Sequence, residues 1–277
     1  MNSKDITFII VTYHSEKVIF DCLDLLPKES KKIIIENSNN IDLKNILENK
    51  YDNLSCSLMH ENLGYGKANN IGIKLSVTEY VFILNPDVRF GNNDLNKFLN
   101  ILNDKDFIIA APTASEEINP AKSNNEVKEV DFVKGFAMLL KKNFFMNSFF
   151  DENIFLYLEN DDFCKRLVDH NEEIYVVPKS KINHLGGKAV SQKFSEEVEL
   201  SRNWHWIWSK FYFKRKHKGY FFALINGLPT FFSAVLKCVL YLLIFNPKKS
   251  KIYLHRAKGY LNAAIGRKSF FRPNIKI

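Results

Sequence analysis

The chain has 277 residues, 46% of them hydrophobic, which is enough for one large core or for a core with an appendage. Its four cysteines lack C-x-x-C spacing, which argues against a zinc ribbon or a disulfide framework and favours a reducing, cytoplasmic setting. The net charge of +8 combines −8 over residues 1–201 with +16 over residues 202–277, where no acidic residue occurs. We therefore expect an acidic domain followed by a basic tail that meets a polyanionic surface.

The first part of the chain starts without a recognisable signal peptide and alternates between strand-like and helix-like patterns. Strands are expected at 6–12, 32–36, 54–60 and 80–84, and helices at about 16–26, 42–47 and 66–75 between them. Connections of this kind give a right-handed, largely parallel sheet. The pattern predicts an α/β fold in which helices flank a mostly parallel sheet.

The expected strand at 80–84 ends abruptly at the sequence N-P-D, residues 85–87. Its run of apolar residues suits a strand that is covered on both faces, and Pro86 removes a hydrogen-bond donor and ends the ladder. Ligands of open α/β sheets lie beyond the carboxyl ends of the strands, so we expect Asp87 to face a ligand. A lone carboxylate there suits a hard divalent cation that takes its other ligands from phosphate and water. An Asp that merely caps a turn is the alternative.

Residues 114–129 are polar and lose all periodicity, which predicts a mobile surface loop. Further along, the acidic cluster Glu159, Asp161 and Asp162 lies at the start of a helix expected over residues 161–170. Such acids are favourable at the amino end of a helix whatever else they do.

The basic tail contains an apolar run, residues 219–245, whose one charge is Lys237. A nucleic-acid-binding arm would mix its basic residues with polar ones, so we expect an anionic membrane surface and no nucleic acid. The aromatic residues upstream lie beside cations, as at a membrane interface: Trp204, Trp206, Trp208, Phe211, Tyr212 and Phe213 with Lys210, Lys214, Arg215, Lys216 and Lys218. A basic helix packed on the protein's own core is the alternative.

A transmembrane span needs roughly 20 apolar residues. Here Asn226, Gly227, Pro229 and Lys237 interrupt the run, and cations crowd both of its flanks. We therefore expect helices that lie peripherally in the interface, on the cytoplasmic face of the cell membrane. A single span is the less favoured alternative.

Seven short motifs follow one another along residues 5–190. They are V-T-Y at 11–13, E-N-S at 36–38, E-N-L-G-Y-G-K-A-N-N-I-G-I at 61–73, N-P-D-V at 85–88, G-F-A-M-L-L-K-K from 135, F-L-Y-L-E-N-D-D-F-C-K-R at 155–166 and H-L-G-G from 184. In this order the chain resembles a family 2 glycosyltransferase of the GT-A fold, close to the rhamnosyltransferase-like branch. The resemblance implies a catalytic domain over residues 1–201, and the charge and apolar run described above indicate a membrane-associating tail over residues 202–277.

The resemblance also implies a reaction. A sugar would move, with inversion, from a nucleotide-diphosphate donor of the dTDP-rhamnose or UDP-hexose type to a lipid-linked or other cell-envelope glycan acceptor. The donor would lie against Thr12, Tyr13, Glu36, Asn37, Asn62, Gly64, Gly66, Asn69, Asn85 and Gly135. The family usually has Asp where this chain has Glu36, and that Asp accepts a hydrogen bond from the base. Asp87 takes the place of the second aspartate of the D-x-D element, and with His184 it would hold Mg²⁺ or Mn²⁺ as a Lewis acid.

The general base is less well defined by the resemblance. The family pattern is E-D-x-D and this chain has E-N-D-D, so the expected base position is Asn160, which cannot accept a proton. We expect Glu159, Asp162 or Asp161 to act instead, in that order. Asn160 also motivates a non-catalytic glycan-assembly subunit as an alternative. A nucleotidyltransferase is the second alternative, although its usual G-x-G-T-R-like loop is replaced here by T-Y-H-S-E.

Overall fold

The computed structural model describes residues 1–273 except 92, 115–125, 143–148 and 187–194. The chain folds as two compact units. The first comprises Met1–Asp151 and Asn160–Ser191, and the second comprises Glu152–Glu159 and Gln192–Ile277. The boundary expected after residue 201 lies inside a helix of the second unit.

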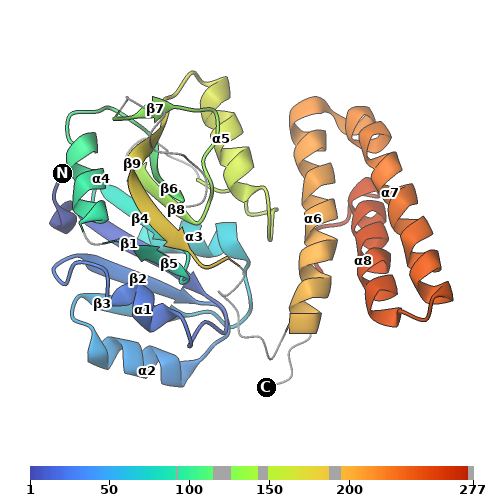
Figure 1. Ribbon diagram of the computed structural model, residues 1–277, viewed down its shortest axis with the longest axis horizontal. Coiled ribbons are helices and arrows are strands. Elements are labelled where there is room, and N and C mark those ends of the chain that lie inside the picture. Colours follow the sequence, from blue (N-terminus) through green and yellow to red (C-terminus); the bar gives the residue numbers. More distant parts are fainter. Residues whose placement is uncertain (92, 115–125, 143–148, 187–194, 274–277) are drawn as a thin grey trace. The chain divides into compact units, whose positions relative to one another are not determined.

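The first unit is built on one sheet, in which the described residues form nine strands in the order β3-β2-β1-β4-β8-β6-β9-β5, with β7 beside β9 (Figure 1). The strands are β1 (Ile6–Thr12), β2 (Lys31–Glu36), β3 (Leu54–Leu58), β4 (Tyr80–Leu84), β5 (Val88–Phe90), β6 (Ile109–Ala114), β7 (Lys128–Glu129), β8 (Ala137–Lys141) and β9 (Ile174–His184). The first four run parallel, β8 is antiparallel to β4, and β6 and β9 are parallel to each other. The expected α/β fold with a largely parallel sheet is confirmed.

The core lies on both faces of this sheet. Along β4, Phe82 and Leu84 belong to one hydrophobic cluster, whereas Val81 and Ile83 belong to another, and all four are fully buried. Successive side chains of a strand point to opposite faces, so each face of β4 is covered. The uniformly apolar run therefore marks a central strand, as its composition indicates.

Five helices accompany the sheet in the described part of the first unit: α1 (Ile19–Leu23), α2 (Ile41–Lys50), α3 (Tyr65–Leu75), α4 (Asp94–Leu102) and α5 (Glu159–Asp169). A single 3₁₀ turn, η1 (Ser3–Asp5), precedes β1. The helix expected over residues 16–26 is only five residues long. The residues before it form a turn, in which the Ser15 carbonyl accepts from the Val18 and Ile19 amides, and no side chain caps the helix. Most of the loop expected at 114–129 lies outside the described residues.

The second unit contains three helices, α6 (Ser195–Lys218), α7 (Tyr220–Leu243) and α8 (Pro247–Ala264). Trp204, Ile207, Trp208 and Phe211 form a stripe on α6 and are buried in the core of this unit. Their i, i+3, i+4, i+7 spacing is that of a core-facing helix. The interfacial role expected for Trp204, Trp208 and Phe211 is therefore wrong, and the alternative, packing on the protein's own core, is correct for these three.

Helix α7 continues through Asn226, Gly227 and Pro229, the residues that interrupt its apolar run. Gly227 is needed for packing, because a Cβ at this position would lie 2.2 Å from the Tyr260 ring of α8. Within the described residues, α7 is the one helix long and apolar enough to cross a membrane.

Candidate active site

The carboxyl ends of β1 and β2 are joined by a buried carboxylate. Thr12 and Glu36 are neighbours in the parallel register, and the Thr12 hydroxyl donates to Oε2 of Glu36 at 2.5 Å. Oε1 accepts from the Ser38 amide at 2.6 Å and from the Ser38 hydroxyl. Burial raises the pKa of Glu36, and the Ser38 and Thr12 donors oppose that rise. Both oxygens are thus hydrogen-bonded within the protein. A nucleobase N–H would have to share the Glu36 carboxylate with the Thr12 and Ser38 donors.

The loop before α3 is tied to the same strand ends. The Asn37 side chain donates to the Gly64 carbonyl at 3.3 Å and accepts from the Leu63 amide at 3.4 Å. The Gly64 amide donates to the Asn62 side chain at 3.0 Å, and that side chain also hydrogen-bonds the Tyr13 hydroxyl. Gly64 has φ +83°, a left-handed conformation that favours glycine. Hydrogen bonds therefore connect these residues, which the sequence analysis expects to bind the nucleotide-sugar donor, into one loop cluster.

Helix α3 buries Gly66 and two consecutive asparagines that play different parts. Asn70 is structural, because its side chain donates to the Phe150 carbonyl at 2.9 Å and accepts from the Phe150 amide at 3.0 Å. Asn69 donates to the Tyr65 carbonyl at 3.0 Å, but its own Oδ1 is buried and has no donor among the described residues. Buried acceptors are nearly always satisfied, so this oxygen is free to receive a ligand group.

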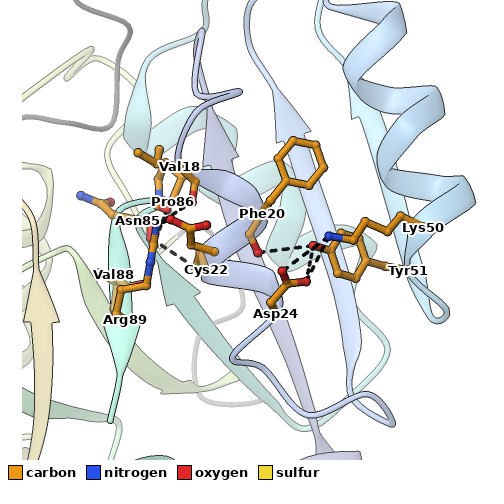
Figure 2. Close-up of polar contacts among 11 residues, drawn as sticks. Val18, Phe20, Cys22, Asp24, Lys50, Tyr51, Asn85, Pro86, Val88 and Arg89 are labelled. Atoms are coloured by element: carbon orange, nitrogen blue, oxygen red, sulfur yellow. Dashed lines mark hydrogen bonds and ion pairs between the residues drawn. The ribbon is translucent and has the colours of Figure 1, made fainter.

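Asn85 closes the turn that follows β4. Its carbonyl accepts from the Val88 amide at 3.1 Å, and its amide donates to the Phe136 carbonyl at 2.8 Å. The Cys22 thiol of α1 also lies 3.8 Å from the Asn85 carbonyl (Figure 2). The backbone of the turn is therefore fixed from three sides.

Arg89 fixes the peptide groups on both sides of Asp87, a role that the sequence analysis missed. Its Nη1 donates to the carbonyls of Pro86 at 3.0 Å and Val88 at 2.9 Å. Its Nη2 donates to the Val18 carbonyl at 2.8 Å (Figure 2). The same Nη2 contacts the Asp21 carboxylate at 3.1 Å. One guanidinium thus holds the turn against α1. The arginine between two apolar residues of a very short strand is the signal that could have found it.

Asp87 itself is fully buried, and neither of its carboxylate oxygens has a hydrogen-bond donor among the described residues. Its carboxylate lies beside His184, whose Nε2 is 3.4 Å from Oδ1. His184 faces the turn because β5 pairs with β9 through Val88 and His184, and its ring stacks on Phe136 at a centroid distance of 4.3 Å. Burying a carboxylate without donors is costly unless a cation offsets it.

Asp87 and His184 therefore fit a divalent cation as two of its ligands. Among the described residues, no group of three or more His, Cys, Asp and Glu side chains could hold a metal by itself. A two-ligand protein site is typical of Mg²⁺ that also binds substrate phosphates and water. The pair also lies at the sheet edge where β1, β2 and β4, which are parallel neighbours, all end.

Gly135 connects this edge to the start of α5. It precedes β8, the antiparallel partner of β4, and its carbonyl accepts from the Tyr65 hydroxyl at 2.5 Å. A Cβ at Gly135 would lie 3.2 Å from Cγ of Asn160. Asn160 in turn donates to the Val133 carbonyl at 3.0 Å. Asn160 is thus held by the 133–135 segment, and a Cβ at position 135 would press against its side chain.

The three acids of the cluster have different surroundings. Asp162 is fully buried and accepts from Nε of Arg166 at 3.1 Å, so its charge is already paired. Glu159 is buried at the first position of α5. Asp161 is partly exposed, and burial raises its pKa above the usual value. A carboxylate that solvent and substrate can reach and whose pKa is raised is the best equipped to accept a proton, and among the three acids this is Asp161.

Comparison with known proteins gives one family and several relatives. Residues 7–164 match the model of "Glycosyl transferase family 2". The low-salt glycan biosynthesis hexosyltransferase Agl10 of Haloferax volcanii is 25% identical over 198 residues, which are 61% of this chain and 64% of that protein. The dTDP-rhamnosyl transferase RfbF of Shigella flexneri is 23% identical over 215 residues, which are 69% of this chain and 72% of that protein. The match thus spans less than two thirds of Agl10.

Among solved structures, the mannosyltransferase PcManGT of Pyrobaculum calidifontis, in complex with GDP-Man and Mn²⁺, is similar with a TM-score of 0.57. It is 12% identical, and the match covers 94% of this chain and 86% of that one. At this identity the likeness shows the fold.

Proposed function

This chain belongs to glycosyl transferase family 2, and we propose on that premise that it moves a hexose or deoxyhexose, with inversion, from a nucleotide-diphosphate sugar to a lipid-linked or other cell-envelope glycan acceptor. The observation that carries the proposal is the buried, donor-free carboxylate of Asp87, 3.4 Å from His184 at the carboxyl edge of the parallel strands. A carboxylate in this state is costly to the fold and is useful where a cation and a diphosphate bind.

The donor would bind across the ends of β1 and β2 and the loop before α3. Glycine at positions 64 and 66 lets the backbone approach the ligand closely, and the amino end of α3 provides N–H groups for the diphosphate. The donor-free Oδ1 of Asn69 offers a hydrogen-bond acceptor on the same helix. The relatives act on a dTDP-rhamnosyl group and a hexosyl group by their names, so those donors come first.

Asp87 and His184 would hold Mg²⁺ or Mn²⁺ in this proposal. When bound, the cation neutralises the charge that develops on the departing nucleotide diphosphate. Arg89 keeps the Asp87 peptide groups in place. Asp161 takes the proton from the acceptor hydroxyl as that hydroxyl attacks the anomeric carbon from the side opposite the diphosphate, which inverts the configuration.

The proposal is tested by donor binding. Calorimetric titration of the full-length protein with dTDP-rhamnose, UDP-hexoses and GDP-mannose, each with MnCl₂ or with EDTA, should identify one preferred donor. We expect EDTA to weaken its binding at least about tenfold, because the diphosphate loses the cation that joins it to Asp87. Slow hydrolysis of the bound donor would distinguish an enzyme from a non-catalytic assembly subunit. If no nucleotide sugar binds under either condition, the proposed function is wrong.

We also propose that the helical unit places the enzyme on the cytoplasmic face of the membrane. Helix α7 packs on its neighbours through small residues such as Ala223 and Ala234, and its other face exposes apolar side chains, including Phe221 (75% exposed), Phe232 (62%) and Leu236 (61%). No acidic residue follows residue 201, whereas cations lie at both ends of α7. An apolar face bordered by cations suits an anionic lipid surface.

The packing of α8 on α7 favours a position in the plane of the interface. The Tyr260 hydroxyl of α8 donates to the Leu224 carbonyl of α7 at 2.8 Å, and the Ser250 hydroxyl donates to the Cys238 carbonyl at 2.9 Å. If α7 crossed the bilayer in this packing, α8 would enter it with its lysines and Arg256. Each such charge costs about 2.5–3.5 kcal/mol at the centre of the bilayer.

Sedimentation with lipid vesicles tests the membrane surface. The full-length protein should sediment with vesicles that contain phosphatidylglycerol, less with pure phosphatidylcholine, and less at high salt, because salt screens the cationic share of the attraction. Replacing Lys248, Lys249 and Lys251 together by Glu should weaken the binding. The matched control replaces three exposed lysines of the first unit, Lys28, Lys97 and Lys105, by Glu and should bind normally. Resistance to carbonate extraction, with protease access to the carboxyl terminus from the outer face, would establish a span instead.

A further inference from the structure

Two stacked tyrosines join α7 to α8, which lie side by side in the helical unit (Figure 1). The rings of Tyr241 of α7 and Tyr253 of α8 have a centroid distance of 5.4 Å and an interplanar angle of 9°. Both side chains are partly exposed, and neither hydroxyl makes a hydrogen bond within the described residues. The two hydroxyls are therefore available to a ligand.

Three cations surround this pair of rings. The Nζ of Lys249 lies 5.2 Å from the centre of the Tyr241 ring. The Nζ of Lys237 and the guanidinium of Arg256 lie 5.4 Å and 5.3 Å from the centre of the Tyr253 ring. Cations at such distances are attracted to the faces of aromatic rings. The stacked rings thus gather three positive charges at one place.

Helical spacing explains why these five residues meet. Lys237 and Tyr241 are four residues apart on α7, and Lys249, Tyr253 and Arg256 have i, i+4, i+7 spacing on α8. Residues at these spacings lie on one face of a helix. The five residues, here called the seam, therefore form a continuous surface where the two faces meet.

The positive charge of the seam has no carboxylate partner among the described residues. Arg256 donates from Nε to the neutral Asn203 side chain at 2.7 Å. By contrast, Lys251, on the same helix but outside the seam, lies 3.9 Å from the Glu196 carboxylate. No acidic residue follows residue 201. Three uncompensated cations favour a ligand that carries more than one negative charge.

The seam borders the exposed apolar face of α7. Leu236 and Leu240 are exposed, and they are neighbours of Lys237 on the helix surface. A lone lysine of an apolar helix can simply extend its amine to water. Here the amine lies instead over the Tyr253 ring, which also receives Arg256. A lipid would fit this border with its phosphate on the seam and its chains against the apolar face.

We propose that the seam binds the phosphate group of a membrane lipid whose head group is a phosphomonoester or a diphosphate. A phosphomonoester carries a charge of about −1.5 to −2 at pH 7, whereas a phosphodiester such as phosphatidylglycerol carries a single negative charge. The three cations neutralise the larger charge, and the two tyrosine hydroxyls donate to its oxygens. This inference rests on the membrane position proposed above and adds a head-group preference to it.

The test compares two soluble lipids with identical chains, dihexanoyl phosphatidic acid and dihexanoyl phosphatidylglycerol, below the concentrations at which they form micelles. Calorimetric titration of the full-length protein, in buffer freed of divalent metal, should give a Kd at least about tenfold lower for the phosphatidic acid. Lys237→Gln together with Lys249→Gln should remove most of this preference, because each basic residue near an anionic lipid contributes about fivefold. The matched control replaces Lys248 and Lys258, which are exposed on α8 outside the seam, by Gln and should keep the preference.

A second variant guards against a folding or general charge defect in the first. Tyr241→Phe together with Tyr253→Phe keeps both rings and every charge but removes the two hydroxyls. It should reduce the preference at least about threefold, because hydrogen bonds to a charged group are lost. Inorganic pyrophosphate, which has no chains for the apolar face, should bind more weakly than phosphatidic acid.

Three results would overturn the inference: equal affinity of the wild type for the two lipids, an unchanged preference in both seam variants, or an equal loss in the Lys248 and Lys258 control. Pyrophosphate binding as tight as that of phosphatidic acid would exclude a lipid as the ligand. If the wild type sediments with phosphatidylglycerol vesicles but shows no head-group preference, this inference alone fails. If it binds neither vesicles nor soluble lipids, the proposed membrane position fails with it.

Discussion

Replacing Asp87 by alanine should abolish sugar transfer while leaving the fold intact. The carboxylate lies at the end of a central strand, 3.4 Å from His184, and it has no donor of its own among the described residues. In the proposed function its only substantial partner is the cation. A loss of at least about a hundredfold in kcat is expected, because Lewis-acid assistance supplies several kcal/mol.

The stability of this variant provides a second readout. A buried carboxylate without donors costs the folded protein free energy, so Asp87→Ala should unfold in EDTA at a temperature no lower than the wild type. Mn²⁺ should raise the melting temperature of the wild type and not that of the variant, because a ligand stabilises only the state that binds it. Asp106→Ala, which removes an exposed acid from the same unit, should keep both the activity and the response to Mn²⁺. Near wild-type, EDTA-sensitive turnover in Asp87→Ala would show that the metal role is wrong.

The sequence predicted the sheet because its strands carry local signals. The apolar run of β4 and its N-P-D terminus identified a central strand that ends at the ligand edge, and the structure has that strand at Tyr80–Leu84. The stripe of Trp204, Trp208 and Phe211 carried an equally local signal, namely helical spacing. Reading those aromatic residues by composition and not by period gave the wrong environment.

Features that depend on distant segments could not be predicted. Glu36 accepts a hydrogen bond from Thr12 on a neighbouring strand as well as from nearby Ser38. The Asp87 carboxylate receives no hydrogen bond among the described residues because of how the surrounding segments fold around it. Residues 152–158 show the same limit, because they precede α5 in sequence but contact α6, more than forty residues later. Nothing in the local pattern of residues 152–159 indicates that partner.

The order of the candidate bases also changes with the tertiary surroundings. The sequence places Glu159 first and Asp162 second among the candidate bases. In the structure Asp162 is fully buried and its carboxylate is paired with Arg166, so it is already engaged within the protein. Burial raises the pKa of Asp161. We therefore expect Asp161→Asn to have the largest effect of the three amide variants.

Asp161→Asn should lower kcat at least about a hundredfold without a matching loss of donor binding, because an amide cannot accept the acceptor's proton. The base works when deprotonated, so wild-type kcat should fall as the pH drops through the pKa of Asp161. Since burial raises that pKa, the decline should begin at a higher pH than an ordinary aspartate would give. The variant should be no less stable than the wild type at neutral pH, since it removes the cost of a partly buried charge.

Two further variants separate catalysis from structure. Asp169→Asn changes an exposed acid at the other end of α5 and should leave kcat unchanged. Asp162→Asn breaks a buried ion pair and should lower the melting temperature, an effect that Asp161→Asn should not share. If the amide variants of Glu159, Asp161 and Asp162 all keep near wild-type kcat, none of these acids is the base. If the wild type binds donor but neither transfers nor hydrolyses it, Asn160 at the expected base position favours the non-catalytic assembly subunit.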